Sequence, residues 1–525
     1  MRRFNTAGPC DAIRHYLVPP EPRLPEARGL VAQGAYFVVH APRQTGKTTT
    51  LWALARALCA EGSTAALHFS CETGESAGDD LVMAQGAVLD SIRRQAEIDL
   101  PPELRPPARW PDASPAQLLS AALTSWARSC PRPLVLFFDE IDALRGESLR
   151  AVLRQLRAGY QSRPAAFPAA VALCGLRDVR DYKAASGGDP SRLGTSSPFN
   201  IKLKSVRLGD FTATDLRALY GQHTAETGQP FTEEALARAW ELTQGQPWLV
   251  NALAREVVEE IGVAPPATIK AEHLEEAKER LILARQTHLD SLAARLMEPR
   301  VRRILEPIMA GTLQGGDAYD DDAQYVRDLG LVAPDRPLRV ANPIYREVIA
   351  RVLSVAVEDN LDLEPQRFVL GDGQLDLRLL LEEFAAFWRE HGEVLGQGLP
   401  YHEVAPQLVL MAFLQRVVNG GGYIDREYGG VGGRIDLLVR WPFRAAGGGR
   451  EWQREALELK VWAAGKPDPL GRGLEQLEAY LERLGLGHGV LVIFDRRPEA
   501  GPIEGRTHFA EARTAGGREV TVLRA

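Results

Sequence analysis

The feature that most constrains this chain is an apolar run at residues 35–40, which leads through a short polar loop into a helical pattern at about 47–60. A loop that joins a buried strand to a helix N-terminus presents backbone N–H groups to an anion, and the helix dipole favours the negative charge. We predict that Lys47 reaches the β- and γ-phosphates of ATP and that the Thr48 hydroxyl holds Mg²⁺. The predicted nucleotide-binding residues are Ala41, Pro42, Arg43, Gln44, Thr45, Gly46, Lys47, Thr48 and Thr49.

One residue of this loop departs from the usual pattern. Ala41 stands where such loops begin with a glycine. If the backbone there needs a positive φ, the alanine would be strained, because only glycine adopts that conformation at little cost. The intact Gly-Lys-Thr end of the loop limits the expected effect to nucleotide affinity.

A second apolar run, Leu134–Phe138, ends in two adjacent acids, Asp139 and Glu140. A run without polar alternation predicts a strand buried on both faces, and the acids then lie at the carboxyl edge of the sheet, where α/β sheets bind ligands. We predict that Asp139 holds Mg²⁺ through water and that Glu140 orients or deprotonates the attacking water. The alternative is that both acids only cap the next helix. Arg177 is a candidate γ-phosphate sensor or an ordinary surface arginine.

The order of elements predicts several domains, because 525 residues exceed what one hydrophobic core organises. Strands alternate with helices first, which indicates a parallel sheet covered on both faces, an αβα sandwich. A mainly helical segment follows, then short helices with a turn and strand at 331–340 that look like a winged helix. The predicted divisions are 1–211 for the sandwich, 212–296 for the helical segment, 297–356 for the winged helix, 357–374 for an acidic linker and 375–525 for a separate α/β fold.

The loop sequence APRQTGKT, the acids DEID and the element Gly245-Gln246-Pro247 resemble the AAA-like archaeal-type ATPases of the STAND group. The resemblance covers roughly residues 1–355. It implies a P-loop NTPase core followed by a helical lid and a winged helix. It also implies that Pro247 approaches the nucleotide.

The C-terminal region carries a second set of chemistry-bearing residues. Asp436 lies in one predicted strand, and Glu458 and Lys460 lie two apart, hence on one face, in the next. A hairpin between these strands brings Asp436 beside Glu458, and two carboxylates with a lysine suit a hard divalent cation that activates water against a phosphodiester. Gln476 and Tyr480 share one face of the following helix and could brace this site. The alternative is a salt-bridged hairpin without catalysis.

This set, D…ExK…QxxxY, resembles the PD-(D/E)xK nuclease superfamily and its RecB-like branch over about residues 375–500. The resemblance implies a restriction-endonuclease-like domain, DNA as the substrate, and a further acidic metal ligand on the first helix. Glu403 matches that ligand, and Glu427 competes for the same role. Ile435 precedes Asp436 where the family often has proline, so the motif here is shorter.

Composition argues against several classes of protein and indicates the cellular compartment. The formal net charge of -7 argues against a protein that only coats nucleic acid. The five cysteines form no CxxC pair, the N-terminus lacks a signal-peptide core, and the apolar runs are too short for a bilayer, so a reducing cytoplasm is expected. The scattered arginines of the winged-helix segment favour packing over phosphate contact.

Together these patterns predict an ATP-binding, ATP-hydrolysing protein that controls a Mg²⁺-dependent nuclease acting on DNA, with a role in defence or in mobile elements as a hypothesis. Catalysis is assigned to Glu140, Asp436, Glu458 and Lys460. One alternative is a regulatory or scaffold ATPase whose C-terminal domain binds nucleic acid or protein without cleaving. Another is a DNA-translocating ATPase with a nuclease-like clamp. Assembly into a homo-oligomer is left open.

Overall fold

The structure is a computed structural model in which the chain forms two compact units. The first comprises Met1–His288 with Gln324–Val332, and the second comprises Leu289–Ala323 with Ala333–Ala525. The residues described are 1–176, 201–284, 287–309, 320–358, 364–398, 405–418, 422–428, 435–444, 449–497 and 499–525.

The first unit is built on a five-stranded parallel sheet in the order β2-β3-β4-β1-β5. Its strands are β1 (Tyr36–His40), β2 (Ala65–Ser70), β3 (Leu134–Asp139), β4 (Ala170–Gly175) and β5 (Lys204–Arg207). Strands β1 and β3 confirm the apolar runs predicted as strands at 35–40 and 134–138. The edge strand β5 was not predicted, because its sequence KSVR has only one buried residue and so carries no apolar run.

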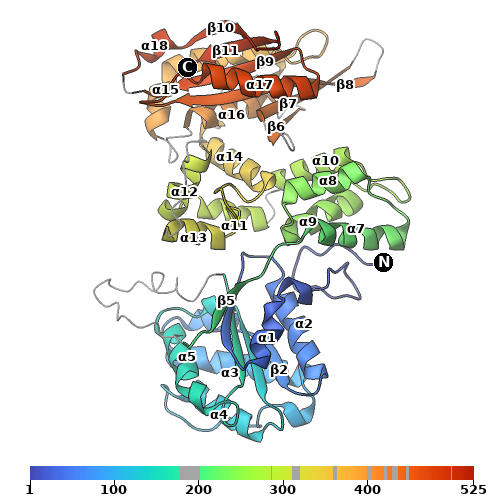
Figure 1. The fold of residues 1–525 in the computed structure, drawn as a ribbon, viewed down its shortest axis with the longest axis vertical. Helices are drawn as coiled ribbons and strands as arrows, with labels where there is room; N and C mark the ends of the chain where they lie inside the picture. Colours follow the sequence, from blue (N-terminus) through green and yellow to red (C-terminus); the bar gives the residue numbers. More distant parts are fainter. Residues whose placement is uncertain are drawn as a thin grey trace. The chain divides into compact units, whose positions relative to one another are not determined.

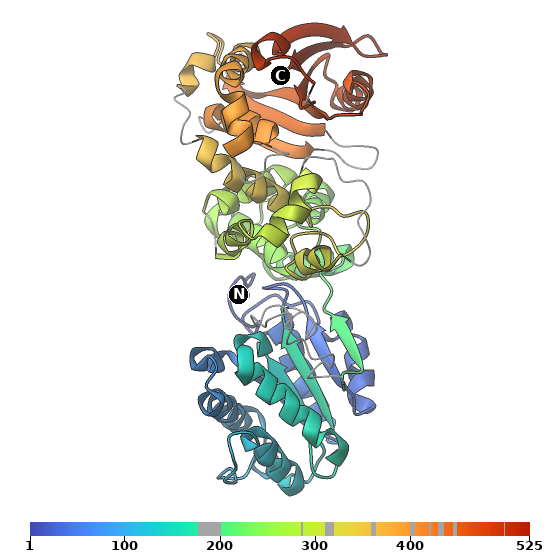
Figure 2. The ribbon, with the colours of Figure 1, turned by 90° about the vertical axis from the view of Figure 1, so that its left-hand side faces the viewer.

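Helices cover both faces of this sheet (Figure 1). One face packs against α1 (Glu26–Ala32) and α2 (Lys47–Ala60) through residues such as Phe37, Leu51 and Leu54. The other packs against α3 (Leu81–Asp99), α4 (Leu118–Ser129) and α5 (Gly146–Gly159) through Val88, Trp126 and Leu153. Figure 2 shows the strands flanked by these helices from the side. The predicted αβα sandwich is therefore confirmed.

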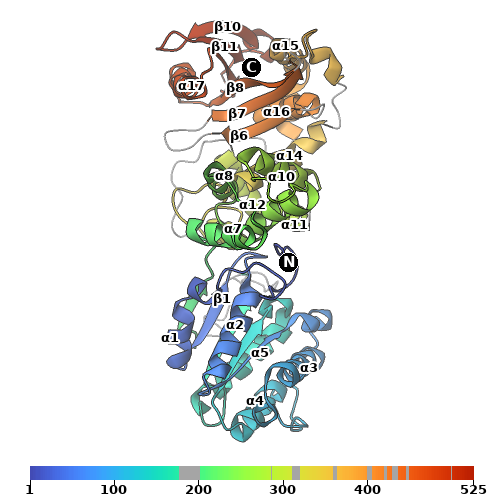
Figure 3. The ribbon, with the colours of Figure 1, turned by 90° about the vertical axis from the view of Figure 1, so that its right-hand side faces the viewer.

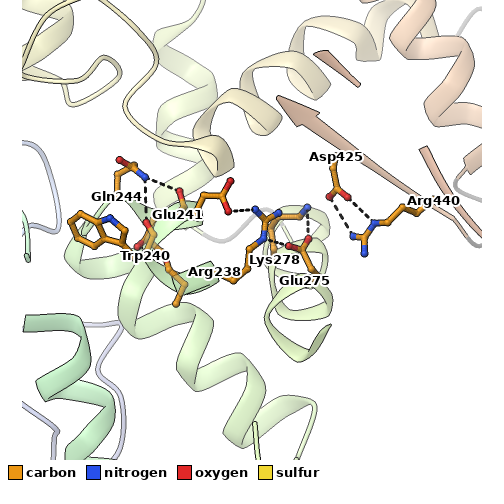
Figure 4. A network of polar contacts seen from close by, with 10 residues as sticks. Arg238, Trp240, Glu241, Gln244, Glu275, Lys278, Asp425 and Arg440 are labelled. Atoms are coloured by element: carbon orange, nitrogen blue, oxygen red, sulfur yellow. Dashed lines mark hydrogen bonds and ion pairs between the residues drawn. The ribbon is translucent and has the colours of Figure 1, made fainter. Parts of the chain in front are cut away.

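A helical segment follows the sheet and confirms the prediction for this part of the chain. Its elements are α7 (Ala213–Thr227), α8 (Glu233–Thr243), α9 (Pro247–Arg255), η7 (Glu256–Glu260) and α10 (Ala271–Leu283). A capping box starts α7, since Thr212 and Asp215 exchange side-chain and backbone hydrogen bonds. Arg238 of α8 forms an ion pair with Glu275 of α10, and Lys278 bonds the same carboxylate at 3.0 Å (Figure 4). This network joins α8 to α10.

Short 3-10 helices connect the elements of the first unit. They are η1 (Glu21–Arg23), η2 (Glu72–Ala77), η3 (Pro102–Leu104), η4 (Ile141–Ala143) and η5 (Tyr160–Ser162). The N-terminal segment packs on α7, where Phe4 and Tyr16 meet Tyr220 and His223. Tyr16 Oη lies 3.1 Å from His223 Nδ1.

The helix α11 (Thr287–Arg295) ends the segment predicted as helical. The segment predicted as a winged helix, 297–356, contains α12 (Pro299–Met309), α13 (Asp321–Asp328) and most of α14 (Pro343–Glu358). The predicted turn within 331–340 is present, but the predicted strand is reduced to isolated β-bridges at Val332 and Val340. The N–H of Ala333 donates to the Arg339 carbonyl at 2.9 Å and closes the turn. Pro334 and Pro337 lack the N–H groups that a strand ladder needs.

Part of this segment belongs to the first unit and contacts the loop between β1 and α2. Gly330 has φ 79°, and a Cβ built on it would lie 2.6 Å from Pro42 Cγ. Any side chain at this position would therefore clash. Asp328 Oδ1 lies 3.7 Å from His40 Nδ1, and both residues are buried.

The second unit contains a six-stranded mixed sheet in the order β10-β11-β9-β8-β7-β6. Its strands are β6 (Tyr423–Tyr428), β7 (Ile435–Arg444), β8 (Arg450–Trp462), β9 (His488–Asp495), β10 (His508–Arg513) and β11 (Glu519–Arg524). The hairpin β7–β8 and the parallel pair β8–β9 confirm the predicted strand, hairpin, strand, helix, strand order. Strands β6, β10 and β11 were not predicted.

Helices lie on opposite faces of this second sheet (Figure 3). The helix α17 (Leu470–Leu484) packs Leu477 and Tyr480 against Leu438 and Ala456. On the other face, Phe384 of α15 (Leu377–Gly398) contacts Phe494 of β9 and Phe413 of α16 (Ala405–Val418). The remaining short helices are η8 (Pro365–Phe368) and α18 (Ile503–Arg506). No helix in the described parts of either unit has the length and apolar composition to cross a membrane.

Candidate nucleotide and metal sites

The loop between β1 and α2 has the geometry of a phosphate-binding loop. Helix α2 begins at Lys47, directly after Gly46 in the left-handed conformation (φ 85°). The Thr45 hydroxyl donates to the Pro42 carbonyl at 2.9 Å, which holds the turn. The backbone N–H groups at this helix N-terminus suit an anion.

The strain expected at the start of this loop lies elsewhere. Ala41 has no positive φ and is fully buried, so an alanine fits there without strain. Gln44 takes the positive φ instead, at 57°. The expectation for Ala41 is therefore corrected: the unusual backbone conformation of this loop is carried by Gln44 and Gly46.

Lys47 turns back onto its own loop. Its Nζ donates to the carbonyls of Ala41 at 2.9 Å and Pro42 at 2.6 Å. Burial lowers the pKa of Lys47, against the opposing effects of Cys174 and Asp139. An arriving phosphate would give this ammonium a stronger, charge-assisted acceptor than a neutral carbonyl.

Asp139 is the centre of a buried hydrogen-bonded group. Its Oδ2 accepts from the Thr48 hydroxyl at 2.7 Å and lies 3.0 Å from His68 Nε2. Burial alone would raise the pKa of Asp139, but hydrogen bonds from His68, Thr48 and Cys174 outweigh burial and lower it. The carboxylate is therefore ionised at neutral pH, in the form that a metal ion requires.

Glu140 follows in a left-handed conformation, with φ 55°. Its Oε2 accepts a hydrogen bond from the Ser70 hydroxyl. Burial raises the pKa of Glu140, and the charges of Asp139, Glu72 and Asp142 raise it further, which makes it more basic than an exposed glutamate. A non-glycine residue with positive φ at such an edge aims its side chain in a direction that an ordinary strand end would not give.

Two residues of this site were missed in the sequence. His68 and Ser70 both lie on β2, which pairs with β3 so that Ser70 is opposite Asp139. Each is a polar residue in the otherwise apolar strand AALHFS, and they are spaced two apart. That spacing puts both on one face beside the acids, and it was the signal that could have identified them.

The Gly245-Gln246-Pro247 element forms the start of α9. The N–H of Phe211 donates to the Gly245 carbonyl at 2.8 Å, and a Cβ on Gly245, which has φ 79°, would lie 2.0 Å from the Phe211 oxygen. Pro247 is buried at the first turn of the helix, after Gln246, whose side chain accepts from the Leu249 N–H. The approach of Pro247 to a nucleotide remains a prediction, and Arg177 lies outside the described residues.

The second sheet brings together the residues predicted from the C-terminal motif. The β7–β8 register, with Leu437 opposite Leu457, puts Asp436 across from Glu458. Asp436 Oδ2 accepts from the Leu459 N–H at 2.8 Å, and Lys460 forms an ion pair with Glu458. Burial, together with the charge of Asp436, raises the pKa of Glu458 to about 7, against the opposing effect of Lys460.

Two oxygen atoms on this face lack hydrogen bonds. Among the residues that the structure describes, the buried Glu458 Oε2 and Gln476 Oε1 have no hydrogen-bond partner. Buried oxygens without donors are costly unless a cation or water satisfies them. They therefore fit the donor set of a hard divalent ion such as Mg²⁺. Tyr480 is buried one turn further along α17 and belongs to the apolar core beneath it.

Two residues, Glu403 and Glu427, were predicted as candidates for the third acidic ligand. Glu403 lies outside the described residues, whereas residue 427 is in β6, between Arg426, which pairs with Leu437, and Tyr428, which pairs with Ile435. This register puts residue 427 opposite Asp436. Within the described residues, no group of three His, Cys, Asp or Glu side chains is arranged to hold a metal ion.

No protein-family model and no curated protein matches the sequence. Among solved structures, the chain is similar to the Walker-type ATPase PABY2304 of Pyrococcus abyssi, with 14% identity and a TM-score of 0.45, covering 66% of this chain and 99% of the other. It is also similar to the Aeropyrum pernix ORC2 protein, with 14% identity and a TM-score of 0.35, covering 62% and 90%. For Cdc6p from Pyrobaculum aerophilum the identity is 14% and the TM-score 0.35, covering 66% and 96%. All three TM-scores lie below 0.5, so these likenesses carry no argument about what this chain binds.

Proposed function

We propose that the first unit binds and hydrolyses ATP with Mg²⁺ at the edge of its parallel sheet. The observation that carries this proposal is the direct bond from Thr48 to Asp139, beside Lys47 at the start of α2. Thr48 and Asp139 would hold the metal, and the backbone N–H groups of residues 43–48 with Lys47 would hold the phosphates. Glu140, made more basic by burial, would accept a proton from water.

We propose further that the second unit cleaves phosphodiester bonds, most simply in DNA, under control of the nucleotide state of the first. Asp436 and Glu458 would hold a divalent cation, which when bound lowers the pKa of its water and polarises the phosphate. The unsatisfied Glu458 Oε2, buried beside Asp436, supports this assignment. Lys460 would position the water or the phosphate.

One set of variants tests both halves. Full-length wild type, Lys47→Ala and Asp436→Ala are compared for ATP affinity by titration calorimetry and for cleavage of plasmid with Mg²⁺ or Mn²⁺, with and without ATP. Lys47→Ala should weaken ATP binding about 100-fold, because a charged contact is lost from a preformed anion site. Asp436→Ala should bind ATP normally and leave plasmid whole.

The outcomes separate the two proposals. ATP affinity that is unchanged in Lys47→Ala would overturn the nucleotide site. Plasmid left equally whole by wild type and Asp436→Ala would overturn the nuclease. The Glu458–Lys460 ion pair would then favour the alternative, a regulatory ATPase whose second unit binds without cleaving. ATP turnover stimulated by long DNA without cleavage would instead indicate a translocating ATPase.

A further inference from the structure

Beyond the part that α17 covers, the hairpin β7–β8 carries arginines on one face and glutamates on the other. Its register pairs Arg440 with Arg454 and Pro442 with Trp452. Because cross-strand partners point to the same face and the side chains alternate, these residues share the face of Asp436 and Glu458. Glu451 and Glu455 alternate with them on the opposite face of β8. Tyr423 joins the first face, since it pairs with Arg440 from β6.

The opposite face of this hairpin is packed. Gln453 exchanges two hydrogen bonds with the backbone of Leu375, at 2.7 and 2.9 Å. The Trp441 indole N–H donates to the Gly373 carbonyl at 2.9 Å. The turn at Gly373–Leu375 therefore covers the side that carries the two glutamates.

The first face is exposed and positively charged. Arg444 and Arg454 are exposed, and Trp452 keeps 41% of its surface accessible. Arg440 and Arg454 are direct cross-strand partners, an arrangement that costs stability when like charges face each other. The buried Asp425 offsets part of this charge through its ion pair with Arg440 at 2.7 Å (Figure 4). The excess of arginine stands out in a chain whose net charge is -7.

Aromatic rings lie among these arginines. Tyr423 and Trp452 have ring centroids 5.5 Å apart, and the Arg440 guanidinium lies 5.5 Å from the first ring and 6.0 Å from the second. Arginines that contact phosphates, interleaved with rings that stack on bases, are the chemistry by which proteins bind single-stranded nucleic acid. An acidic protein partner would pair with the arginines, but its carboxylates offer no ring on which the exposed Trp452 could stack.

We propose that this surface, the arginine face, defined as Tyr423, Arg440, Arg444, Trp452 and Arg454, binds an unpaired strand of nucleic acid and leads it to the carboxylates. Arg454 precedes Glu458 by four residues on the same strand, which is about 13 Å along β8. A bound strand of a few nucleotides therefore spans both. The guiding role rests on the proposed nuclease function, whereas the binding itself does not.

The test measures binding without cleavage. Full-length protein in EDTA is titrated into a fluorescently labelled dT oligonucleotide of about 20 nucleotides and into a duplex of the same length. The variants are the double substitution Arg444→Glu/Arg454→Glu, the single Trp452→Ala, and Arg454→Gln as the mildest change. Arg513→Glu, an exposed arginine on β10 at the far edge of the same sheet, is the matched control.

Wild type should bind the single strand more tightly than the duplex. The double substitution should weaken binding at least about tenfold and reduce the slope of log affinity against log salt by roughly 1.4, because two phosphate contacts are lost. Trp452→Ala should weaken binding about tenfold through lost stacking. Arg454→Gln should give a smaller loss, and Arg513→Glu should bind as wild type.

Wild-type affinity in both Trp452→Ala and Arg454→Gln would overturn the proposal. So would competition by polyglutamate as effective as by the oligonucleotide, which would identify an acidic protein as the occupant. A wild type that binds the single strand but cleaves nothing would remove the nuclease and leave the arginine face standing. Cleavage that persists equally in the double substitution would overturn the guiding role of the arginine face and leave the nuclease standing.

Discussion

The two candidate sites differ in how their polar atoms are satisfied. In the first unit, Lys47 bonds loop carbonyls, Thr48 bonds Asp139 and Ser70 bonds Glu140. In the second, Glu458 Oε2 and Gln476 Oε1 are buried without a hydrogen-bond partner among the described residues. The polar groups of the nucleotide site thus satisfy one another, and ATP would have to rearrange these hydrogen bonds. In the carboxylate site, the buried oxygens lower the stability of the fold, and a bound cation would remove this penalty.

The largest expected effect concerns Glu140, which should be needed for turnover but not for binding. Glu140→Gln should lower the rate of ATP hydrolysis by about 100-fold or more, because the neutral amide cannot accept a proton from water. ATP affinity should stay near the wild-type value, which calorimetry beside a phosphate-release assay would show. Glu72→Gln, an exposed neighbour whose charge also raises the pKa of Glu140, is the control and should keep near-normal turnover. Near-normal hydrolysis by Glu140→Gln would make the first site a binding site alone.

The destabilisation caused by the buried Glu458 carboxylate in the second site should depend on pH. The pKa of Glu458 is raised from 4.5 to about 7, so the folded state favours the protonated form. The contribution of Glu458 to the free energy of unfolding is fully present below about pH 4.5. It is lost as the pH rises through about 7, and the loss is at most about 3 kcal/mol. Urea unfolding in EDTA at about pH 5 and about pH 8, followed by a probe in the second unit, would measure the difference.

Two comparisons sharpen this result. Glu458→Gln should remove most of the pH dependence, and Mg²⁺ should restore wild-type stability at the higher pH, since a bound cation replaces the missing partner. Glu475→Gln, an exposed carboxylate on α17, should unfold as wild type does. A pH-independent wild type would mean that Glu458 is already satisfied, and the contrast between the two sites would disappear.

The smallest expected effect concerns His68, which contacts Asp139, the proposed metal ligand of the first site. His68→Leu should raise the Mg²⁺ concentration needed for half-maximal ATP turnover about tenfold, because Asp139 loses one of the hydrogen bonds that orient it. The rate at saturating Mg²⁺ should change less. His68→Asn, which keeps a donor, should recover part of the loss. An unchanged Mg²⁺ requirement in His68→Leu would show that Thr48 alone orients the carboxylate.

The first site was more predictable from sequence than the second for a physical reason. The loop and helix proposed to hold phosphate are continuous, from Ala41 to Thr49, so local spacing alone indicates them. Glu458 and Asp436 are 22 residues apart and meet only through a hairpin register. His68 was missed because a single polar residue in an apolar strand has no meaning until its neighbouring strand is known.

Backbone hydrogen bonding explains several of the remaining differences between prediction and structure. The edge strands β5 and β6 need only one partner strand, so they tolerate mixed sequences that show no apolar run. The predicted strand at 331–340 is limited to bridges at Val332 and Val340, because Pro334 and Pro337 lack the N–H groups that a longer ladder needs. Neither effect is visible in hydrophobic spacing.

The path of the chain between the two units has a consequence for how such a protein could be divided or fused. Residues 289–323 belong to the second unit, 324–332 return to the first, and the chain then leaves it again. A truncation at residue 288 would delete Gly330 from its place against Pro42 and uncover the phosphate-binding loop. The two units are therefore not separated by a single point in the sequence. A recombination event that replaced the C-terminal sheet would have to keep the returning segment, so its junction would fall after residue 332.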